Sequence, residues 1–398
     1  MMLERHIPLD GHETPYLYGV DCGIALAEAL AARTGSADSV LLVADRKVAA
    51  HTAPLARQLS HHVKVETFGI DASETNKTMS LVQGIAESAI SRGVNRSSLV
   101  IGMGGGMVGN VAGLTAALLF RGTGLIHLPT TPVAAFDSVV SVKQAVNLRG
   151  GKNLCGTYYA PSLIACDLRW LSTVPHEELF TGLSEMAKNV LAVLPGEEET
   201  LRGALSALPG ERIGPLLQLF DIGVTAKEPF LRQDPRERRE ALIFEYGHTV
   251  GHALEFISGG SMKHGEAVAW GMLVAAEVSH SLGILGGEDL RSHYRIVDWL
   301  RLPDPRTRLG RFDRAELRAK LATDNKRGYI PCGRDEVAMV LLESLGGPLT
   351  GESGYPLVPV PQETVMAALE TVTGHSWTER GGTIGEKEDA RWKTSNLL

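Results

Sequence analysis

Short apolar runs separated by amphipathic stretches dominate the first part of the chain. The runs SVLLVAD (39–45), SSLVIGM (97–103) and GLIHLP (124–129) are rich in branched apolar residues, which is typical of parallel strands buried on both faces. The segment KTMSLVQGIAESAISRG (77–93) has apolar residues at helical spacing instead. This alternation predicts an α/β domain over residues 1–168.

The pattern changes after residue 168, where strand-like runs become scarce. Amphipathic helical patterns cover residues 177–194, 225–229 continuing into 238–256, and 265–285. We therefore expect a second, mainly α-helical domain over residues 169–375. The last residues, 376–398, are mostly polar or charged, and this composition predicts a disordered tail.

Composition and charge narrow the classes of function. A chain of 398 residues with 44% hydrophobic residues can bury a core in each of two domains. The net charge of -7 argues against nucleic acid as a partner. No run reaches the roughly 18 apolar residues of a membrane span, the N-terminus lacks an apolar signal segment, and the four cysteines form no C-x-x-C pair. These features predict a cytoplasmic protein with reduced thiols and no membrane partner.

A glycine-rich segment, GMGGGMVGNVAG, lies between a predicted strand and a predicted helix. It contains G-x-G-x-x-G at Gly104, Gly106 and Gly109, where the backbone can approach a pyrophosphate at a helix N-terminus. A tight glycine turn without a ligand would give the same pattern. Asp45 precedes this turn, whereas the ribose-binding acid of an ordinary Rossmann unit follows it by about 20 residues. The pattern therefore predicts a variant, Rossmann-like nucleotide-binding domain.

Histidines at helical spacing mark the second domain. His248 and His252 lie at i and i+4 in FEYGHTVGHALE, and so share one face of a predicted helix. His264 opens HGEAVAWGM, and Glu185 lies one turn from Lys188 in GLSEMAKNV. Histidine and carboxylate ligands with an open position are a common catalytic metal arrangement. Spacing alone does not select the three ligands, and any single histidine could be structural.

Six ordered motifs resemble the sugar phosphate cyclases typified by 3-dehydroquinate synthase. They are GGGMVGNVAG, RGTGLIHLPTTPVAAFDS, KQAVNLRGGKN, GLSEMAKN, EYGHTVGHALE and HGEAVAWGM, and the resemblance covers residues 40–345. It implies a dehydroquinate synthase-like fold, NAD retained through turnover, and a divalent metal, zinc or cobalt. It further implies that Glu185, His248 and His264 bind this metal, while His252 lies beside them on the substrate side.

The resemblance also assigns residues to the cofactor, the substrate and catalysis. The residues assigned to NAD are Asp45, Glu74, Lys77, Gly104, Gly105, Gly106, Asn110, Thr130 and Thr131. Those assigned to a sugar phosphate are Asp137, Lys152, Asn153, Lys227, Lys326 and Arg121. Those assigned to catalysis are Lys143, Lys188, Glu245 and His252. Lysines suit a phosphate dianion, although Lys143 and Lys152 could instead lie on a solvated loop. Arg121 is expected to reach across the interface of a homodimer.

The implied activity is that of a carbon–oxygen lyase. Transient oxidation by NAD would make a neighbouring C–H acidic and allow phosphate to leave. Reduction and an intramolecular aldol reaction would then close a carbocycle.

Departures from the 3-dehydroquinate synthase pattern indicate the substrate. That enzyme usually carries R-x-x-x-N-x-G-H-T, where this chain has Ala241 and Glu245. Loss of the guanidinium removes a bidentate partner for a substrate carboxylate, and a glutamate would repel that carboxylate. Asn110, Val142 and Gln144 depart as well. These features resemble the branch that converts D-glucose 6-phosphate to 2-deoxy-scyllo-inosose in aminoglycoside antibiotic biosynthesis.

Three alternatives remain at this point. The first is a sedoheptulose 7-phosphate cyclase of the 2-epi-5-epi-valiolone synthase type, which also takes a substrate without a carboxylate. The second is 3-dehydroquinate synthase itself. The third is an NAD-dependent alcohol dehydrogenase of the iron type, which would share the two-domain architecture but needs no phosphate-binding lysines.

Glu245 is expected on the same helical face as His248, facing the pocket. A surface glutamate on the first helical turn is the simpler alternative.

Overall fold

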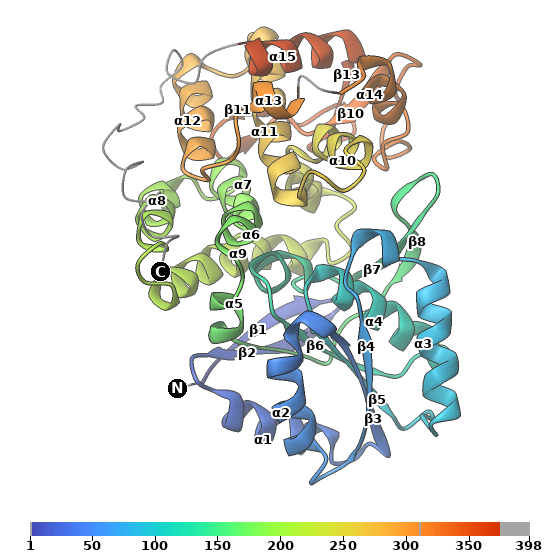
Figure 1. Cartoon of the computed structure of the whole chain (residues 1–398). Helices are drawn as coiled ribbons and strands as arrows, with labels where there is room; N and C mark the ends of the chain where they lie inside the picture. Colours follow the sequence, from blue (N-terminus) through green and yellow to red (C-terminus); the bar gives the residue numbers. More distant parts are fainter. Residues whose placement is uncertain (1, 310–311, 375–398) are drawn as a thin grey trace.

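The computed structural model describes residues 2–309 and 312–374, and it has an α/β domain below a mainly helical domain in the view of Figure 1. The predicted tail over 376–398 lies outside the described residues. Within the described part, no helix is both long and apolar enough to cross a bilayer.

A seven-stranded sheet forms the centre of the α/β domain, in the order β1-β2-β9-β6-β5-β3-β4. Its strands are β1 (Met2–Leu9), β2 (His12–Gly19), β3 (Ser39–Asp45), β4 (Lys64–Ile70), β5 (Leu99–Gly104), β6 (Gly124–Pro129) and β9 (Leu163–Asp167). The pair β1–β2 is antiparallel and all other neighbours are parallel. Predicted strands 39–45 and 124–129 coincide with β3 and β6, and 97–103 overlaps β5.

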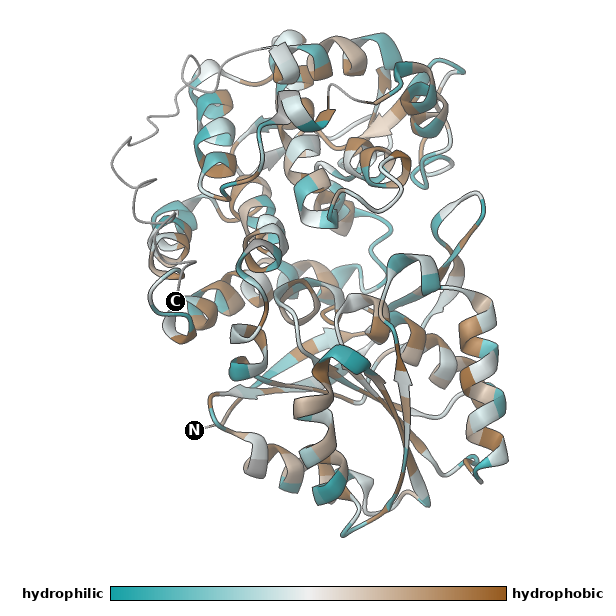
Figure 2. Ribbon diagram, viewed as in Figure 1, coloured by the Kyte–Doolittle hydropathy of each residue, from teal (hydrophilic) through white to brown (hydrophobic). Residues whose placement is uncertain are grey.

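Helices cover both faces of this sheet. They are α1 (Gly23–Thr34), α2 (Ala49–Leu59), α3 (Met79–Ser91) and α4 (Gly106–Leu118), with 3₁₀ turns at Arg46–Val48, Glu74–Asn76 and Leu119–Arg121 and a π-helical turn at Ala134–Ser138. Along β3, Val40 and Leu42 face the core under α1 and α2, whereas Leu41 and Val43 face the core under α3 and α4. Apolar residues on the strands and on the inner sides of these helices form the two layers of core (Figure 2).

A two-stranded antiparallel hairpin, β7 (Lys143–Leu148) and β8 (Gly151–Tyr158), extends from the α/β domain beside the helical one (Figure 1). The hydrophobic pattern did not predict this hairpin, because its strands, KQAVNL and GKNLCGTY, contain no continuous apolar run and line a cavity. It carries Lys143, Lys152 and Asn153.

The chain becomes mainly helical after β9, from Leu168 onward. The helices are α5 (Leu168–Ser172), α6 (His176–Gly182), α7 (Ser184–Ala192), α8 (Glu198–Ala207), α9 (Ile213–Gln233), α10 (His248–Ile257), α11 (His264–Ser281), α12 (Gly287–Asp298), α13 (Pro305–Leu309), α14 (Arg314–Leu321) and α15 (Gln362–Gly374). Further 3₁₀ turns cover Pro195–Glu197 and Glu240–Glu245. Short strands pair as β10 (Glu336–Met339) with β13 (Val358–Pro361) and β11 (Leu342–Ser344) with β12 (Gly347–Pro348). The centre of this domain is α11, whose residues from Gly265 to Ser279 are all buried.

The helix expected over 238–256 is wrong as a single element. The chain forms the 3₁₀ turn Glu240–Glu245, then passes through an extended Tyr246 and a left-handed Gly247 (φ +77°), and α10 begins only at His248. A Cβ at Gly247 would lie 2.7 Å from Met272 Cγ and 2.8 Å from Val268 O on α11. The close approach of α11 therefore requires a glycine at position 247, and its left-handed backbone interrupts the helix that the sequence pattern predicts. The expected helix 177–194 is likewise divided, into α6 and α7.

Candidate active site

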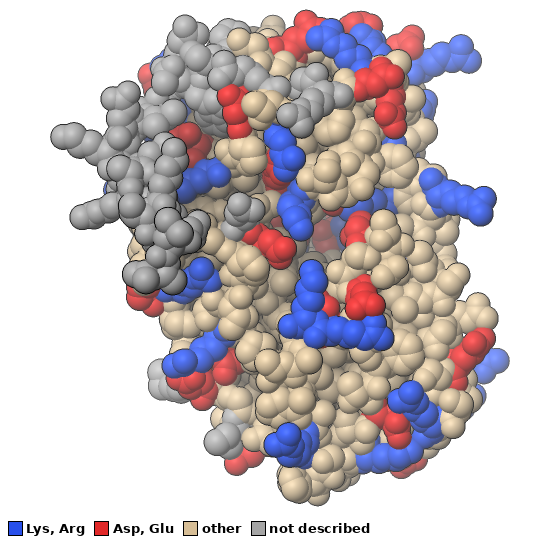
Figure 3. Space-filling view, in the orientation of Figure 1, with Lys and Arg blue, Asp and Glu red and all other residues tan. Residues whose placement is uncertain are grey.

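A cavity of about 650 Å³ lies between the two domains. Charged side chains of both signs gather around the hollow between the domains in Figure 3. The predicted site residues that line the cavity are Glu74, Lys77, Gly106, Asn110, Asp137, Lys143, Lys152, Asn153, Lys188, Lys227, Glu245, His248, His252, His264 and Lys326. Those outside the lining are Asp45, Gly104, Gly105, Arg121, Thr130, Thr131 and Glu185. The fold thus brings together side chains that are up to about 250 positions apart in sequence.

Three residues of the helical domain form a group that can hold a metal ion. Glu185 on α7 is fully buried, and its Oε1 lies 3.6 Å from His248 Nε2 and 3.4 Å from His264 Nε2. The candidate ligand atoms all lie within 4.8 Å of one another. A tetrahedral divalent metal with bonds of about 2.0–2.2 Å needs ligand atoms about 3.3–3.6 Å apart. The geometry therefore fits zinc or cobalt.

Hydrogen bonding leaves the metal-facing atoms of this group available. Neither oxygen of Glu185 accepts a hydrogen bond from the described residues, although Oε2 forms an ion pair with Lys188. His248 Nδ1 lies 3.1 Å from Tyr246 O, and His264 Nδ1 lies 3.0 Å from Glu255 Oε2. Because a neutral histidine donates from one nitrogen only, both Nε2 atoms can present a lone pair to a cation.

The two candidate histidine ligands have opposite electrostatic surroundings. Burial lowers the pKa of His248 to about 4. Burial alone would also lower the pKa of His264, but the charge and hydrogen bond of Glu255, with the charge of Glu185, raise it to about 10. A metal ligand must be unprotonated, so metal binding at neutral pH displaces a proton from His264.

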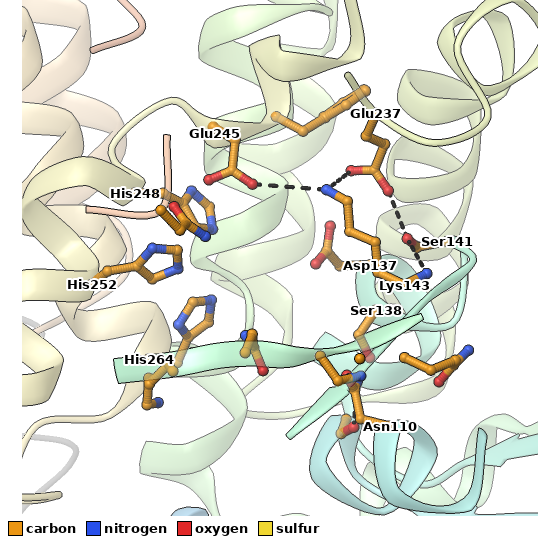
Figure 4. A pocket seen from close by; sticks show the side chains of 18 of the residues that line it. Asn110, Asp137, Ser138, Ser141, Lys143, Glu237, Glu245, His248, His252 and His264 are labelled. Atoms are coloured by element: carbon orange, nitrogen blue, oxygen red, sulfur yellow. Dashed lines mark hydrogen bonds and ion pairs between the residues drawn. The ribbon is translucent and has the colours of Figure 1, made fainter. Parts of the chain in front are cut away.

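His252 lies next to this group but outside it. Its ring centroid is 5.1 Å from that of His248 and 6.1 Å from that of His264, and the three rings face the cavity together (Figure 4). Burial, with the charge of Lys326, holds the pKa of His252 well below its usual range. A neutral imidazole there can contact a substrate without ligating the metal.

Glu245 points into the cavity between two lysines. Its Oε2 lies 3.3 Å from Lys326 Nζ and its Oε1 lies 3.9 Å from Lys143 Nζ (Figure 4). The cavity position was predicted, but the reason was wrong, since Glu245 ends a 3₁₀ turn before α10. Although burial opposes ionisation, Lys326 and other nearby cationic groups hold the pKa of Glu245 well below its usual range. The carboxylate is therefore ionised and can accept hydrogen bonds in the cavity.

Sequence reasoning missed Glu237, which holds Lys143 in place. Lys143 Nζ lies 2.9 Å from Glu237 Oε2, and Ser141 Oγ donates to Glu237 Oε1 at 2.6 Å (Figure 4). Glu237 is only 5% exposed and has a positive φ of 51°. Its surrounding sequence, DPRERRE, has the composition of a solvated loop, so the pattern of charges concealed a buried carboxylate. These contacts hold Lys143, whose side chain is 39% exposed, at the wall of the cavity.

Ion pairs also connect the hairpin with the loops around it. Lys152 pairs with Glu255 of α10, and its Nζ lies 3.3 Å from Glu74 Oε1. Lys77 Nζ donates to Asn153 Oδ1 at 2.5 Å, and burial lowers the pKa of Lys77 to about 8. Lys152 thus joins the α/β domain to the helix that supports His264. Glu255 could have been found in the sequence, because it follows His248 by seven residues on one helical face.

The glycine turn forms an open cradle at the carboxyl end of β5. Gly105 precedes α4 and offers no side-chain cap to the first N–H groups of that helix. A Cβ at Gly104 would lie 2.5 Å from Val108 Cγ2, and one at Gly106 would lie 2.9 Å from Ser138 Oγ. Free N–H groups at a helix start and an approachable backbone suit a pyrophosphate. The predicted NAD residues therefore fit a dinucleotide at this edge.

Two other residues assigned to NAD, Thr130 and Asp45, lie at the same edge of the sheet. Thr130 N donates to Gly104 O at 2.9 Å, and Asp45 ends β3, which neighbours β5 in the sheet. Asn110, also assigned to NAD, lines the cavity and makes two hydrogen bonds within the protein. Its Oδ1 accepts from Ala145 N and its Nδ2 donates to Gly106 O, both at 3.0 Å, so it joins α4 to the hairpin.

Arg121 lies at the far end of α4 from the glycine turn. The 13 residues of α4 span about 20 Å, and Arg121 is not part of the cavity lining. Both Phe120 (φ +54°) and Arg121 (φ +71°) have left-handed backbones. Its expected role across a dimer interface stays a prediction.

Comparison with known proteins covers both domains. Two family models, described as 3-dehydroquinate synthase N-terminal and C-terminal, match residues 67–181 and 182–327. The chain is 41% identical to the 2-deoxy-scyllo-inosose synthase of Streptomyces lividus, over 95% of this chain and 97% of that one. A solved 2-deoxy-scyllo-inosose synthase complexed with carbaglucose-6-phosphate, NAD⁺ and Co²⁺ superposes with a TM-score of 0.83, at 30% identity, covering 93% of this chain and 99% of that one.

A second solved relative is the 2-epi-5-epi-valiolone synthase ValA from Streptomyces hygroscopicus subsp. jinggangensis, with NAD⁺ and Zn²⁺ bound. It is 26% identical, has a TM-score of 0.77, and the match covers 94% of this chain and 100% of that one. The resemblance expected from the six motifs is confirmed. Because the family models span both domains and the relatives align along nearly the whole chain, this protein belongs to the 3-dehydroquinate synthase-like family of sugar phosphate cyclases.

Proposed function

We propose that the protein is a 2-deoxy-scyllo-inosose synthase, a carbon–oxygen lyase that converts D-glucose 6-phosphate into 2-deoxy-scyllo-inosose and phosphate. One observation carries this proposal: the 41% identity to the Streptomyces lividus enzyme extends over both domains. The cavity agrees with a substrate that has a phosphate and no carboxylate. Lysines line it, and none of its described lining residues is an arginine.

NAD and the metal would supply one part of the chemistry, and the side chains of the protein would supply the other. NAD supplies reversible hydride transfer, and a divalent metal supplies polarisation of the sugar hydroxyl that is oxidised. Glu185, His248 and His264 would hold the metal, and the turn at Gly104–Gly106 would hold the pyrophosphate. The protein must then bind the phosphate and move protons at the sugar.

Two kinds of side chain meet these needs. Lys152 and Asn153 on the hairpin, with Lys326 opposite, place donors for a phosphate dianion in one cavity. Glu245 is ionised and held by Lys143 and Lys326, so it would accept a proton or a hydrogen bond from a sugar hydroxyl. Lys143 is held in turn by Glu237.

Release of inorganic phosphate tests the function. The protein with NAD and Co²⁺ would be incubated separately with glucose 6-phosphate, 3-deoxyarabinoheptulosonate 7-phosphate and sedoheptulose 7-phosphate. We expect phosphate from glucose 6-phosphate only, without net NADH. Phosphate from either of the other sugars alone would identify 3-dehydroquinate synthase or a valiolone-type cyclase. Net NADH without phosphate would identify an alcohol dehydrogenase.

We further propose a homodimer in the cytoplasm. The described cysteines are free thiols, which suits a reducing compartment. Arg121 lies outside the cavity of its own chain, so it could contribute to a site only in a partner chain. Mixing Arg121→Ala with His248→Ala subunits should restore about a quarter of the wild-type activity, because one site of each mixed dimer is intact. No recovery would place Arg121 outside the site.

A further inference from the structure

A row of hydrogen bonds leads from α12 to His248, behind the wall of the cavity. His293 Nδ1 lies 2.7 Å from Asp289 O, and His293 Nε2 lies 2.8 Å from the Tyr246 hydroxyl. Tyr246 O in turn lies 3.1 Å from His248 Nδ1. Tyr246 and His293 have no exposed surface, and neither lines the cavity. These two residues therefore cannot touch a substrate, yet they connect directly to a candidate metal ligand.

The direction of each hydrogen bond follows from its partners. Burial lowers the pKa of His293 to about 4, so the ring is neutral at pH 7. Its Nδ1 faces a carbonyl, which only accepts, and must carry the hydrogen. Its Nε2 then accepts from the Tyr246 hydroxyl, whose other contact, Met272 O, is longer at 3.4 Å. By the same reasoning, His248 donates from Nδ1 to Tyr246 O and keeps the lone pair of Nε2 for a metal.

The carbonyl of Tyr246 needs an anchor because the backbone around it is not held by a helix. The 3₁₀ turn ends at Glu245, and α10 begins at His248. Gly247 lies between them, and a glycine restricts the orientation of its preceding peptide least of all residues. Tyr246 N donates to Ile243 O at 3.0 Å, and Gly247 packs against α11. The side chain of Tyr246 adds a tie to α12, through the hydrogen bond to His293 and a T-shaped ring contact at 5.8 Å.

We propose that Tyr246 and His293 are positioning residues for the metal centre. Their hydrogen bond fixes the Tyr246 carbonyl, which holds the imidazole of His248 with Nε2 toward Glu185 and His264. The inference rests on the metal set of the proposed function and not on the identity of the sugar phosphate. Its tests accordingly use the metal and need no substrate.

Cobalt binding to the metal-free full chain measures this role. Tyr246→Phe removes only the hydroxyl, and we expect the Kd for Co²⁺ to rise by about 10- to 100-fold, as for other partners of metal-bound histidines. The visible absorption of the bound Co²⁺ should change, because the geometry of His248 relaxes. NAD binding, measured by calorimetry, should stay within about twofold of the parent, since the glycine turn is in the other domain.

Paired variants of His293 separate positioning from packing. His293→Leu removes the acceptor and should weaken cobalt binding as Tyr246→Phe does. His293→Gln places an amide oxygen near the position of Nε2, and we expect it to recover most of the cobalt affinity.

Tyr294→Phe provides the matched control. Tyr294 is the next residue on α12, is 4% exposed, and donates its hydroxyl to Glu277 Oε1 at 2.6 Å. Its loss should lower the Tm at least as much as Tyr246→Phe while leaving the Kd for Co²⁺ unchanged.

Three results would overturn the inference. One is parental cobalt affinity and absorption in Tyr246→Phe, and another is an equal loss of affinity in Tyr294→Phe. The third is unchanged cobalt affinity in His248→Ala, which would refute the metal set as well. A chain that binds cobalt as expected but releases no phosphate from glucose 6-phosphate would refute the proposed substrate alone.

Discussion

The two sides of the cavity are built in different ways. The metal-capable side takes its three residues from α7, α10 and α11, which pack together within the core of the helical domain. The lysine-rich side takes Lys143 and Lys152 from the hairpin and their partners Glu237 and Glu255 from the helical domain. A relative movement of the domains would leave the metal group intact and would break the ion pairs. One side is therefore a rigid centre, and the other depends on how the domains meet.

Removal of a metal ligand should have the largest effect. His248→Ala should weaken metal binding by more than about 100-fold and abolish turnover. This loss exceeds the one expected when a residue that only hydrogen-bonds a metal ligand is removed. Elemental analysis after dialysis measures the metal. His252→Ala is the control on the same helix, and it should lose turnover while retaining metal. Equal loss of metal in both variants would require a different ligand set.

Glu245→Gln tests the carboxylate that lies between the metal-capable side and the lysine-rich side of the cavity. The amide keeps the shape but removes the charge and basicity, so turnover of glucose 6-phosphate should fall by about 100-fold or more. Metal content and NAD affinity should be nearly unchanged. A variant that turns over at the parental rate would reduce Glu245 to a partner of Lys326, and would remove the main residue-level argument for this substrate.

Lys152→Met breaks the lysine-rich side alone. Loss of a charged donor should raise the KM for glucose 6-phosphate by about 10-fold or more, with a smaller change in kcat. Lys320→Met is a matched control, because Lys320 Nζ donates to Gly150 O at 2.7 Å and joins the same hairpin to α14 outside the cavity. Similar KM values in the two variants would show that hairpin docking, and not phosphate binding, is what Lys152 provides.

The smallest effect concerns acid stability, and it tests one buried histidine of the α/β domain. Burial lowers the pKa of His127 on β6 from 6.5 to about 4. Between these values the unfolded chain binds the proton and the folded chain does not, so stability is complete above pH 6.5 and falls as the pH drops toward 4. His127→Leu should shift the midpoint of acid unfolding downward by a few tenths of a pH unit, as measured by circular dichroism. The exposed His61→Gln should leave the midpoint unchanged, and an equal shift there would contradict the assignment.

Sequence patterns predicted the elements whose surroundings are uniform. Strands β3 and β6 are buried on both faces, so continuous apolar runs mark them with correct ends. The hairpin β7–β8 and the strand β4 lack such runs, since each has partly exposed faces. The break at Gly247 depends on the approach of α11, which lies about 20 residues further along the chain. Local periodicity cannot contain that information.

The residues of the candidate site likewise differ in how well the sequence predicts them. The family motifs contain Glu185, His248 and His264, but only the packing of three helices brings their ligand atoms within 4.8 Å. The sequence pattern missed Glu237 because a run of charges is usually solvated. Here Lys143 and Ser141 from the other domain bind the buried carboxylate. Residues whose partners lie in another domain are therefore the ones that patterns along the chain identify least well.

Lys152 is already paired with two carboxylates, Glu74 and Glu255, before any anion enters the cavity. A phosphate that binds this lysine competes with carboxylates that already act as its counter-ions. Electrostatic attraction for a free anion is correspondingly reduced, because the positive charge is compensated before any ligand arrives. The same carboxylates can recapture the lysine once the bond to the sugar is broken. Inorganic phosphate should therefore be a weak product inhibitor, and its departure should not limit the rate.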